Sequence, residues 1–485
     1  MSESFDVVVI GAGVSGLVAA TYLAQAHVRV LVLEGKALSG GSAANTQPLA
    51  DLAVPAGAHT LCALDPRVVK DLKLARRGLI FAARDMSQVA LTAEGKALTL
   101  TRNVHAAALS LAPISANDAV EFGKFRQGHF AFARALRAIW WDAGELHKPK
   151  QREELRRLTA TGAAAFLDAT FETEALKAAY AFDAMEGGLS LCDAGSSLLL
   201  AWRAAQEMCG LQGAVAVPRG GPAALAASVA AAAEAAGVEI RTNATVTRLL
   251  LSGGAASGVA IGDETVLARA VLSSLSRHQT LLALAPTGAV GLATSRRLLE
   301  RPALVGEAKL VLGLNTIPQF AVGSPSARFI VADHPASLFA GHADARAGRL
   351  PSDLALEAIV PTAFDPSLTS TFHILSVLMR PLPVSPLEGW EVLGPRLADS
   401  VVSRLERHAP GLRDSVIAYA FIPPPLSGDR LDVSHIIGDW RTRIATPIDG
   451  LFLCGMAAEP VPALSGRAAR IAASMAAAYL GGGAK

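Results

Sequence analysis

The stretch Val7-Val8-Val9-Ile10-Gly11-Ala12-Gly13-Val14-Ser15-Gly16 joins an apolar, β-branched run to the pattern G-x-G-x-x-G. An alanine-rich helical pattern follows from Leu17 to Gln25, and a second apolar run, Val28 to Leu33, ends at Glu34. This order of strand, glycine turn, helix, strand and acid predicts a βαβ unit that binds a dinucleotide. An ordinary glycine turn in an α/β domain is the alternative interpretation.

Each element of the pattern has a physical reason. Gly11 permits the tight turn, and Gly13 lets the backbone approach a pyrophosphate at the N-terminus of the helix. Gly16 allows the helix to pack closely on the strand. Glu34 lies 18 residues after Gly16, where its carboxylate can accept hydrogen bonds from a ribose.

Composition limits the class of protein. The chain has 485 residues, of which 51% are apolar and 18% charged, with a formal net charge of +2. We therefore expect two or three domains, or one domain with a large insertion, around a large core and with no nucleic-acid partner. The four cysteines are scattered, which predicts reduced thiols and no metal site. The first strand begins almost at once, leaving no room for a signal peptide, and no apolar run reaches the length of a membrane span, so we expect a cytoplasmic protein.

The residues after Glu34 point to a flavin rather than to a plain NAD site. They read Gly35-Lys36-Ala37-Leu38-Ser39-Gly40-Gly41-Ser42, an acid followed closely by a Gly-Gly turn. This resembles flavoproteins of the amine-oxidase and phytoene-desaturase superfamily, in which the Gly-Gly segment runs along the FAD diphosphate and ribityl chain. Lys36 matches a basic position near the adenosine, with a solvated turn lysine as the alternative. The segment Ala56-Gly57-Ala58-His59 resembles desaturase-like members.

The middle of the chain carries a second part of the resemblance. Val215 to Pro222 contains Pro-Arg-Gly-Gly-Pro before a helix that runs to Ala236, as in the desaturase-like family. There the strand after Gly-Val-Glu-Ile bonds the adenine through its backbone, and Val246 matches that position. We expect Arg219 to be structural or to face the cofactor, not to lie on the surface. These segments are most similar to the subgroup of pyridine nucleotide-disulphide oxidoreductase domain protein 2.

The C-terminal block resembles the FAD-closing motif of the same superfamily. Pro447 to Gly455 reads as a turn and a buried strand, and Gly466-Arg467 begins a final helix of small residues. The loop between them is about three residues shorter than in desaturases, and Glu459 replaces the family histidine. A carboxylate beside an apolar cavity would have a raised pKa suited to a general base. The alternative for Glu459 is solvent exposure, or pairing with Arg467 or Arg470.

The resemblance implies which residues contact FAD. They are Gly11, Gly13, Val14, Ser15, Gly16, Glu34, Gly35, Lys36, Gly40, Gly41, Ser42, Arg219, Val246, Gly455, Met456, Ala463 and Leu464. The candidate catalytic residues are Glu459 and His59.

The predicted fold class is α/β: a Rossmann-like FAD-binding domain assembled from discontinuous segments, with a mixed α+β substrate domain. The predicted FAD-binding parts are residues 1–75, 213–285 and 431–485. Residues 76–212 form a predicted helical cap, whose aromatic stripes are core or the wall of a substrate tunnel. Residues 286–430 form the predicted substrate-domain sheet. The basic cluster from Lys148 to Arg157 is a solvated face or a membrane-surface patch.

These features predict an FAD-dependent oxidoreductase that transfers hydride from an apolar or amphipathic substrate to flavin N5. The alternatives are a reduced-FAD isomerase or saturase, a flavin amine oxidase, and a flavoprotein with mainly a binding role. Candidate partners are a small-molecule substrate, an electron acceptor of unknown identity, a membrane surface contacted peripherally and a second copy of the chain.

Overall fold

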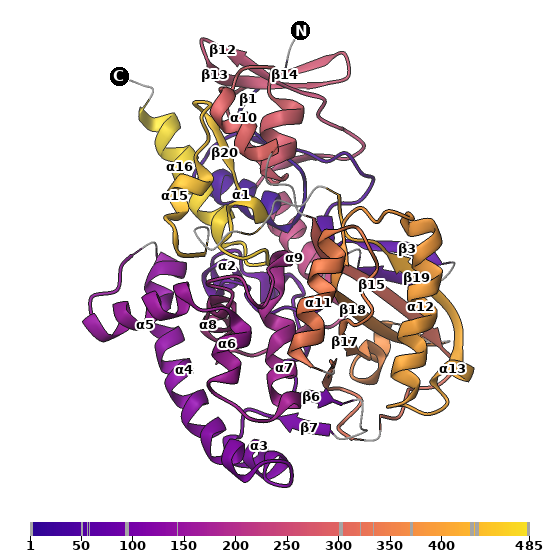
Figure 1. Cartoon of the computed structure of the whole chain (residues 1–485). Helices are drawn as coiled ribbons and strands as arrows, with labels where there is room; N and C mark the ends of the chain where they lie inside the picture. The colour runs from indigo at the N-terminus through magenta and orange to yellow at the C-terminus, as the bar shows by residue number, and fades with distance from the viewer. Residues whose placement is uncertain are drawn as a thin grey trace.

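The fold is taken from a computed structural model. It describes residues 3–49, 52–55, 57, 59–92, 97–142, 144–299, 304–320, 322–332, 334–368, 372–426, 431 and 436–482. Two large sheets organise these residues, with a group of helices beside them (Figure 1).

The first sheet collects strands from three distant parts of the chain. β1, β2, β11, β14 and β20 run parallel, and β12, β13 and β14 form an antiparallel meander. In spatial order the strands are β11 (Glu239–Arg241), β2 (Val30–Leu33), β1 (Glu3–Ile10), β14 (Glu264–Ser273), β13 (Ala255–Ile261) and β12 (Arg248–Ser252), with β20 (Leu451–Leu453) paired to β14. This arrangement confirms the predicted Rossmann-like domain built from discontinuous segments.

Alternation along β1 sends its side chains to two different cores, because successive side chains of a strand point to opposite faces. Val7 and Val9 are buried with α1 (Val14–Gln25), α9 (Pro222–Ala235) and α16 (Arg467–Gly482). Val8 and Ile10 are buried with residues of the meander and of a π-helical turn, Gln279–Leu284. The strand therefore reads as a continuous apolar run, as is typical of a central parallel strand.

The second sheet is mainly antiparallel. In spatial order its strands are β19 (Val416–Ile422), β15 (Val305–Leu314), β18 (His373–Pro383), β17 (Ala355–Ile359), β16 (Arg328–Val331), β6 (Gln88–Leu91) and β7 (Ala97–Leu100). One face packs on α12 (Trp390–Glu406), and the opposite face meets α7 (Glu174–Ala184). Short strand pairs join β3 (Asn45–Leu49) to β4 (Leu52–Pro55), β5 (Phe81–Ala83) to β10 (Val217–Pro218), and β8 (Glu207–Met208) to β9 (Leu211–Gln212).

The helices that connect the strands along the chain form a third group. The longest is α4 (Ala116–Asp142), whose aromatic residues pack with those of neighbouring helices, for example Phe125 on Phe171 at 5.0 Å between ring centroids. These stripes are core. The remaining helices are α2 (Pro66–Asp71), α3 (Val104–Leu111), α5 (Pro149–Ala160), α6 (Ala163–Asp168), α8 (Ser197–Ala205), α10 (Leu292–Leu299), α11 (Pro335–Arg346), α13 (Leu412–Ser415) and α15 (Trp440–Ile444).

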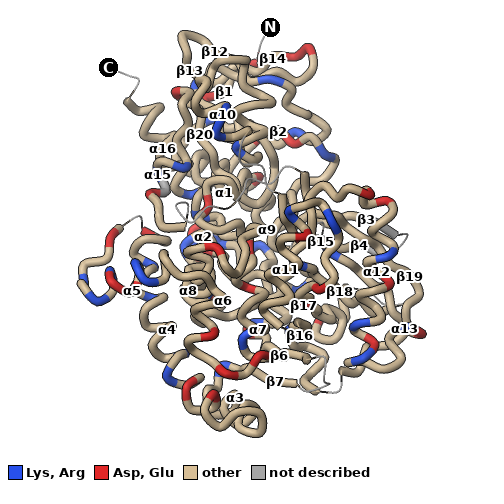
Figure 2. Tube along the Cα trace, viewed as in Figure 1, with Lys and Arg blue, Asp and Glu red and all other residues tan. Residues whose placement is uncertain are grey.

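Surface charge on α5 is mixed rather than purely basic (Figure 2). Arg156 pairs with Glu153 and Arg157 pairs with Glu154, so two of the five cations from Lys148 to Arg157 have an acidic partner on the same helix. Among the described residues, no helix combines the length and hydropathy needed to cross a bilayer.

Two local details differ from the sequence prediction. The segment 76–212 is not purely helical, because β6 and β7 leave it to complete the edge of the second sheet. The strand expected to include Val246 begins only at Arg248, because Asn243 and Ala244 bond back to Lys36 and Glu34. The predicted domain limits themselves remain predictions.

Candidate active site

The glycine turn after β1 is shaped by close packing. A Cβ on Gly16 would lie 2.0 Å from the carbonyl oxygen of Gly11, so only glycine lets α1 approach the strand this closely. Gly11 has φ +91°, and its missing Cβ would lie 2.4 Å from the hydroxyl of Ser274. Two of the three motif glycines are therefore required by the fold itself.

The third glycine, Gly13, leaves room for a ligand. Its missing Cβ would meet only Gly41, at 3.8 Å, so the protein's own packing does not require glycine there. Gly13 is the N-cap of α1, and no side chain caps the helix. Val14 and Ser15 are buried in its first turn. An uncapped helix N-terminus beside an unfilled space fits a pyrophosphate, which the helix N–H groups can bind.

The Gly40-Gly41 turn closes the opposite side of this space. Gly40 N–H donates to the carbonyl of Ala12 at 2.8 Å, which brings the turn against Gly13. The left-handed φ values of Gly40 and Gly41, +123° and +60°, require glycine at both positions. Ser42 is half-buried beyond the turn. The two glycine turns together form the candidate diphosphate site.

Glu34 is positioned at the adenosine end by main-chain bonds. Its carboxylate accepts from Ala12 N–H at 2.8 Å and from Lys36 N–H at 3.0 Å. Lys36 is exposed, and the missing Cβ of Gly35 would lie 2.8 Å from the hydroxyl of Thr245. Val246 is buried, yet its main-chain groups bond no other described residue. Unpaired buried main-chain groups are rare, so this position fits an adenine edge.

Arg219 contradicts part of its prediction. The side chain is exposed, so the expectation that it would not lie on the surface is wrong. The backbone explains the position: Arg219 N–H donates to Ile80, and the next residue, Gly220, adopts φ +80° and donates to Asp365. These bonds fix the turn and leave the guanidinium outside. Its contact with FAD stays a prediction.

Glu459 is built into the start of α16. It is 4% exposed, and its Oε1 accepts from Ser465 Oγ–H and from Ala468 N–H at 3.0 Å. Burial raises the pKa of Glu459, opposed by Arg467 and the Ser465 bond. Because Ala468 lies in the first turn of the helix, these contacts favour a capping role. The predicted catalytic role remains to be tested by kinetics.

The other C-terminal candidates lie around that loop. The missing Cβ of Gly455 would lie 2.1 Å from the carbonyl oxygen of Ser274, so close packing at the end of β14 requires glycine. Met456 is 45% exposed, and Ala463 and Leu464 are half-buried. Their side chains are accessible to a ligand, while their predicted contacts with FAD are untested.

His59 connects the cofactor turns to the second sheet. Gly57 N–H donates to the Ser42 carbonyl at 2.9 Å, and His59 follows two residues later. Ala56 and Ala58 lie outside the described residues. Nδ1 of His59 lies 2.9 Å from the hydroxyl of Ser376, whereas Nε2 has no hydrogen-bond partner within the described structure.

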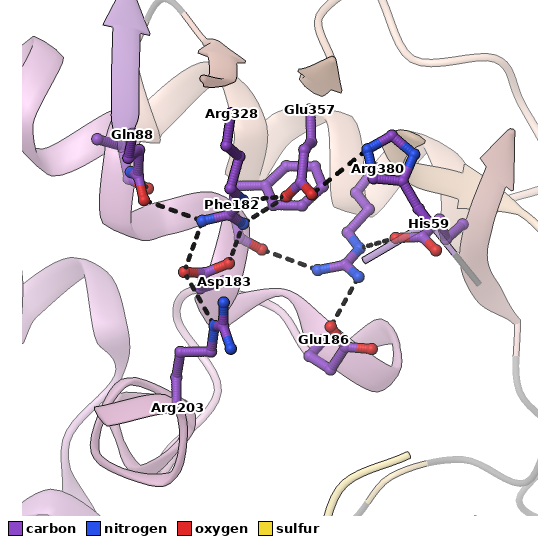
Figure 3. Close-up of polar contacts among 11 residues, drawn as sticks. His59, Gln88, Phe182, Asp183, Glu186, Arg203, Arg328, Glu357 and Arg380 are labelled. Carbon is purple, nitrogen blue, oxygen red and sulfur yellow. Dashed lines mark hydrogen bonds and ion pairs between the residues drawn. The ribbon is translucent and has the colours of Figure 1, made fainter. Parts of the chain in front are cut away.

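A buried cluster of charges begins beside His59 and extends along the second sheet (Figure 3). Arg328 donates to Glu357 at 2.6 Å, to Gln88 at 2.9 Å and to Asp183 on α7. Asp183 has a second cation near it, Arg203, whose Nε lies 3.8 Å from the carboxylate.

Arg380 forms the second centre of the cluster. It donates to Glu307, to Glu186 at 2.7 Å and to the carbonyl of Phe182 at 3.1 Å, while its guanidinium lies 4.4 Å from the Phe182 ring centroid. Lys309 lies on the neighbouring strand and donates to the carbonyl of Pro55 at 2.9 Å.

Burial and neighbouring charge set the protonation of these groups. Burial lowers the pKa of His59 well below its ordinary value, and Lys309, Arg328 and Arg380 lower it further, so the ring is neutral. Burial also lowers the pKa of Lys309 to about 8, opposed by Glu307. Burial raises the pKa of Glu307 to about 7, opposed by Arg380. These two groups titrate near neutral pH.

Sequence patterns pointed to His59 but not to the charged residues around it. The missed signal was a charge inside an apolar strand pattern, as in Glu307-Ala-Lys309-Leu-Val-Leu and Leu356-Glu357-Ala-Ile. Charged residues are almost never fully buried unless they are paired, so such an interruption points to a partner elsewhere in the fold. The partner itself is set by tertiary contacts.

Known proteins share both the sequence pattern and the fold. A family model described as flavin-containing amine oxidoreductase matches residues 14–283. The chain is 27% identical over 547 residues to pyridine nucleotide-disulfide oxidoreductase domain-containing protein 2 of Mus musculus, covering 98% of this chain and 93% of that protein. It is 29% identical over 445 residues to phytoene dehydrogenase of Streptomyces griseus, covering 86% and 82%. A putrescine oxidase variant redesigned for cofactor binding shares the fold, with a TM-score of 0.66, 16% identity and 99% of both chains covered.

The fold and the glycine-lined site define an FAD-dependent oxidoreductase. The match over residues 14–283 spans more than half of the chain, and the chain therefore belongs to the flavin-containing amine oxidoreductase family. This confirms the resemblance seen in the glycine turns at both ends of the sequence.

Proposed function

We propose that this enzyme removes two hydrogens from an uncharged apolar or amphipathic substrate. The substrate would lose a hydride from a C–H bond and a proton from the adjacent carbon or nitrogen, leaving a C=C or C=N bond, and bound FAD would be the acceptor of the hydride at N5. The chain's own residues would position the substrate, exclude water and receive the proton.

The charge balance of the cluster beside His59 is the observation that supports an uncharged substrate. Each carboxylate of the cluster is bonded by an arginine: Asp183 and Glu357 by Arg328, Glu186 and Glu307 by Arg380. A buried ammonium on a substrate would need an unpaired carboxylate of the protein. Among the described cluster residues, no carboxylate is left to provide one.

The relatives also favour an apolar substrate. The phytoene dehydrogenase of Streptomyces griseus is named for a hydrocarbon. A limonene dehydrogenase component of Castellaniella defragrans, also named for a hydrocarbon, is 35% identical over 118 residues, which cover 24% of this chain and 21% of that protein. An isoprenoid-like alkene is therefore the first substrate class to test.

His59 is the candidate proton acceptor in this proposal. Its pKa is held low by burial, so the ring is neutral, and Nε2 has no hydrogen-bond partner among the described residues. In the tautomer whose Nδ1–H donates to Ser376, Nε2 carries the lone pair, and Oε1 of Glu357, 3.7 Å away, would face a proton taken up there, whereas burial and the neighbouring cations oppose that uptake. A positioned base of this kind contributes about 10²–10⁴-fold to a rate.

Anaerobic stopped-flow spectroscopy of the FAD-loaded enzyme tests the proposal. Limonene and phytoene, dispersed in detergent, represent the hydrocarbon class, and putrescine represents amines. We expect bleaching of the oxidised flavin band with a hydrocarbon, and a product two mass units lighter. Bleaching by the amine alone would replace the proposal with amine oxidation, the activity that the family description favours.

A His59→Gln variant tests the role of the ring. With a substrate that bleaches wild-type flavin, we expect reduction to slow by about 10²–10⁴-fold while FAD remains bound. A Gln variant that reduces its flavin at the wild-type rate would remove His59 from the reaction.

In the substrate test, isomerisation of the alkene without net bleaching of the flavin would instead support the reduced-FAD isomerase alternative.

A further inference from the structure

A surface pocket on the FAD-binding side lies apart from the glycine turns and from His59. It has a volume of about 530 Å³ and is enclosed by α2, by a short helical turn at Leu74–Arg77, and by the turn between β8 and β9. This volume falls within the range of small-molecule sites. We call it the α2 pocket.

The interior of the α2 pocket is apolar. Leu64 and Met208 are buried in its wall, and Val69 and Phe81 are half-buried beside them. Such a surface favours a hydrocarbon chain or ring over a fully polar ligand, since burying apolar area contributes roughly 25 cal/mol per Å².

The rim of the α2 pocket is cationic. Lys70, Lys73 and Arg76 line it and are exposed, and none of them pairs with a carboxylate among the described residues. The local backbone groups them, because Lys73 N–H donates to Lys70 and Arg76 N–H donates to Lys73. The acidic residue of the lining, Glu207, is already bonded to Arg137 at 3.0 Å. The rim therefore attracts an anion.

We propose that the α2 pocket binds a single-chain amphiphile with an anionic head, represented by a medium-chain carboxylate such as dodecanoate. The alkyl chain lies against Leu64, Val69 and Met208, and the head group meets the cationic rim. The charge complementarity of the rim selects this occupant over neutral or cationic amphiphiles.

The pocket is tied to the C-terminal segment of the protein. Asp65 caps α2 through a bond from Arg67 N–H at 2.9 Å, and its own N–H donates to the Ser465 carbonyl at 2.9 Å. Occupancy would thus stabilise the wall that supports the loop before α16. This site is independent of the proposed oxidation chemistry.

Cysteine protection locates the ligand. Cys209 lines the α2 pocket and is exposed, while Cys192 is exposed elsewhere on the protein and serves as an internal control. We expect dodecanoate to slow alkylation of Cys209 by iodoacetamide without slowing that of Cys192, measured by mass spectrometry of the full-length holoenzyme. Equal rates at Cys209 with and without dodecanoate would overturn the proposal.

Charge variants test the head group by isothermal titration calorimetry. The triple variant Lys70→Gln/Lys73→Gln/Arg76→Gln should bind dodecanoate about tenfold more weakly, as expected for three exposed charge contacts. The matched triple variant Lys148→Gln/Lys150→Gln/Arg152→Gln removes the same charge from the α5 region and should bind normally. Equal weakening in both variants would show that general attraction is responsible, which overturns the site.

Three comparison ligands separate the contributions. Inorganic phosphate tests the rim alone, dodecanol tests the apolar wall alone, and dodecyltrimethylammonium reverses the head-group charge. We expect each to protect Cys209 less than dodecanoate does. Equal protection by dodecyltrimethylammonium would refute recognition of an anion, and equal protection by phosphate would refute an amphiphile.

Discussion

Replacing Arg328 by methionine tests whether ion pairs hold the buried cluster together. The Arg328 side chain is 5% exposed and bonds both Glu357 and Asp183, whose side chains are 4% and 15% exposed. The variant leaves two carboxylates in a buried environment without their main cation. Breaking such a pair costs about 3–5 kcal/mol of the free energy of unfolding. A methionine of similar length limits the loss of packing.

The pH dependence follows from Asp183. Burial raises its pKa, but Arg328 and Arg203 outweigh that effect and hold the pKa below its ordinary value. In the wild type its stabilising contribution is therefore present above the unfolded pKa and is lost only as the pH falls through the folded pKa. In the variant the carboxylates that have lost Arg328 have raised pKa values, so they take up protons at a higher pH than in the wild type. The loss in the free energy of unfolding caused by Arg328→Met should therefore be smaller at pH 5 than at pH 7.5.

Urea unfolding, followed by circular dichroism at both pH values, measures the difference. Arg156→Met is the control, because its pair with Glu153 is 74% and 75% exposed and should cost less than about 1 kcal/mol. Combining Arg328→Met with Asp183→Asn and Glu357→Gln should recover part of the loss. Ion pairing by Arg328 is refuted if Arg328→Met costs no more than Arg156→Met, or if its deficit does not change with pH.

Four further predictions concern the cofactor and the reaction. Glu34→Ala removes a charged acceptor and should weaken FAD binding by about ten- to a hundredfold, measured by flavin fluorescence titration; an unchanged dissociation constant would contradict the placement of the ribose. Gly16→Ala places a Cβ 2.0 Å from a carbonyl oxygen and should lower thermal stability and FAD occupancy, whereas Gly128→Ala, in open space on α4, should not. Lys309→Met should remove an ionisation near pH 8 from the pH profile of flavin reduction, because the pKa of Lys309 is about 8. If the variant keeps this ionisation, it belongs to another group. Glu459→Gln can still accept bonds from Ser465 and Ala468 and should reduce its flavin at nearly the wild-type rate, whereas slowing of about 10²-fold or more would establish the catalytic role.

The nucleotide end of the site was predictable because its signals are local. Gly16 is required by its contact with Gly11 within one βαβ unit, and Glu34 follows the strand beside them. The start of α2 also has a local signal, because Asp65 precedes Pro66 and accepts from Arg67 N–H as an N-cap. In each case the residues that determine the structure lie close together in the sequence.

The charge cluster was not predictable because its contacts are not local. Arg328 and Asp183 are 145 residues apart, and His59 and Ser376 are 317 apart. The pattern can show that Arg328 begins an apolar strand, but not which carboxylate reaches it. At Arg219 the glycine-rich sequence predicted the turn of the backbone, but it did not predict the direction of the side chain.

The placement of β20 has a consequence for how the protein is made. This strand pairs with β14 and is the last of the first sheet's parallel strands, and it lies at residues 451–453, far from β1 in the sequence. A ribosome adding about 5–20 residues per second needs roughly 20–90 s to travel from β1 to β20. Throughout that time the nascent glycine turn lacks the last parallel strand and α16, and until residue 273 is made it also lacks β14, which pairs directly with β1. The sheet that carries the glycine turns is therefore complete only when the last tenth of the chain has been made, and a premature stop anywhere before residue 451 removes part of a domain that begins at the first strand.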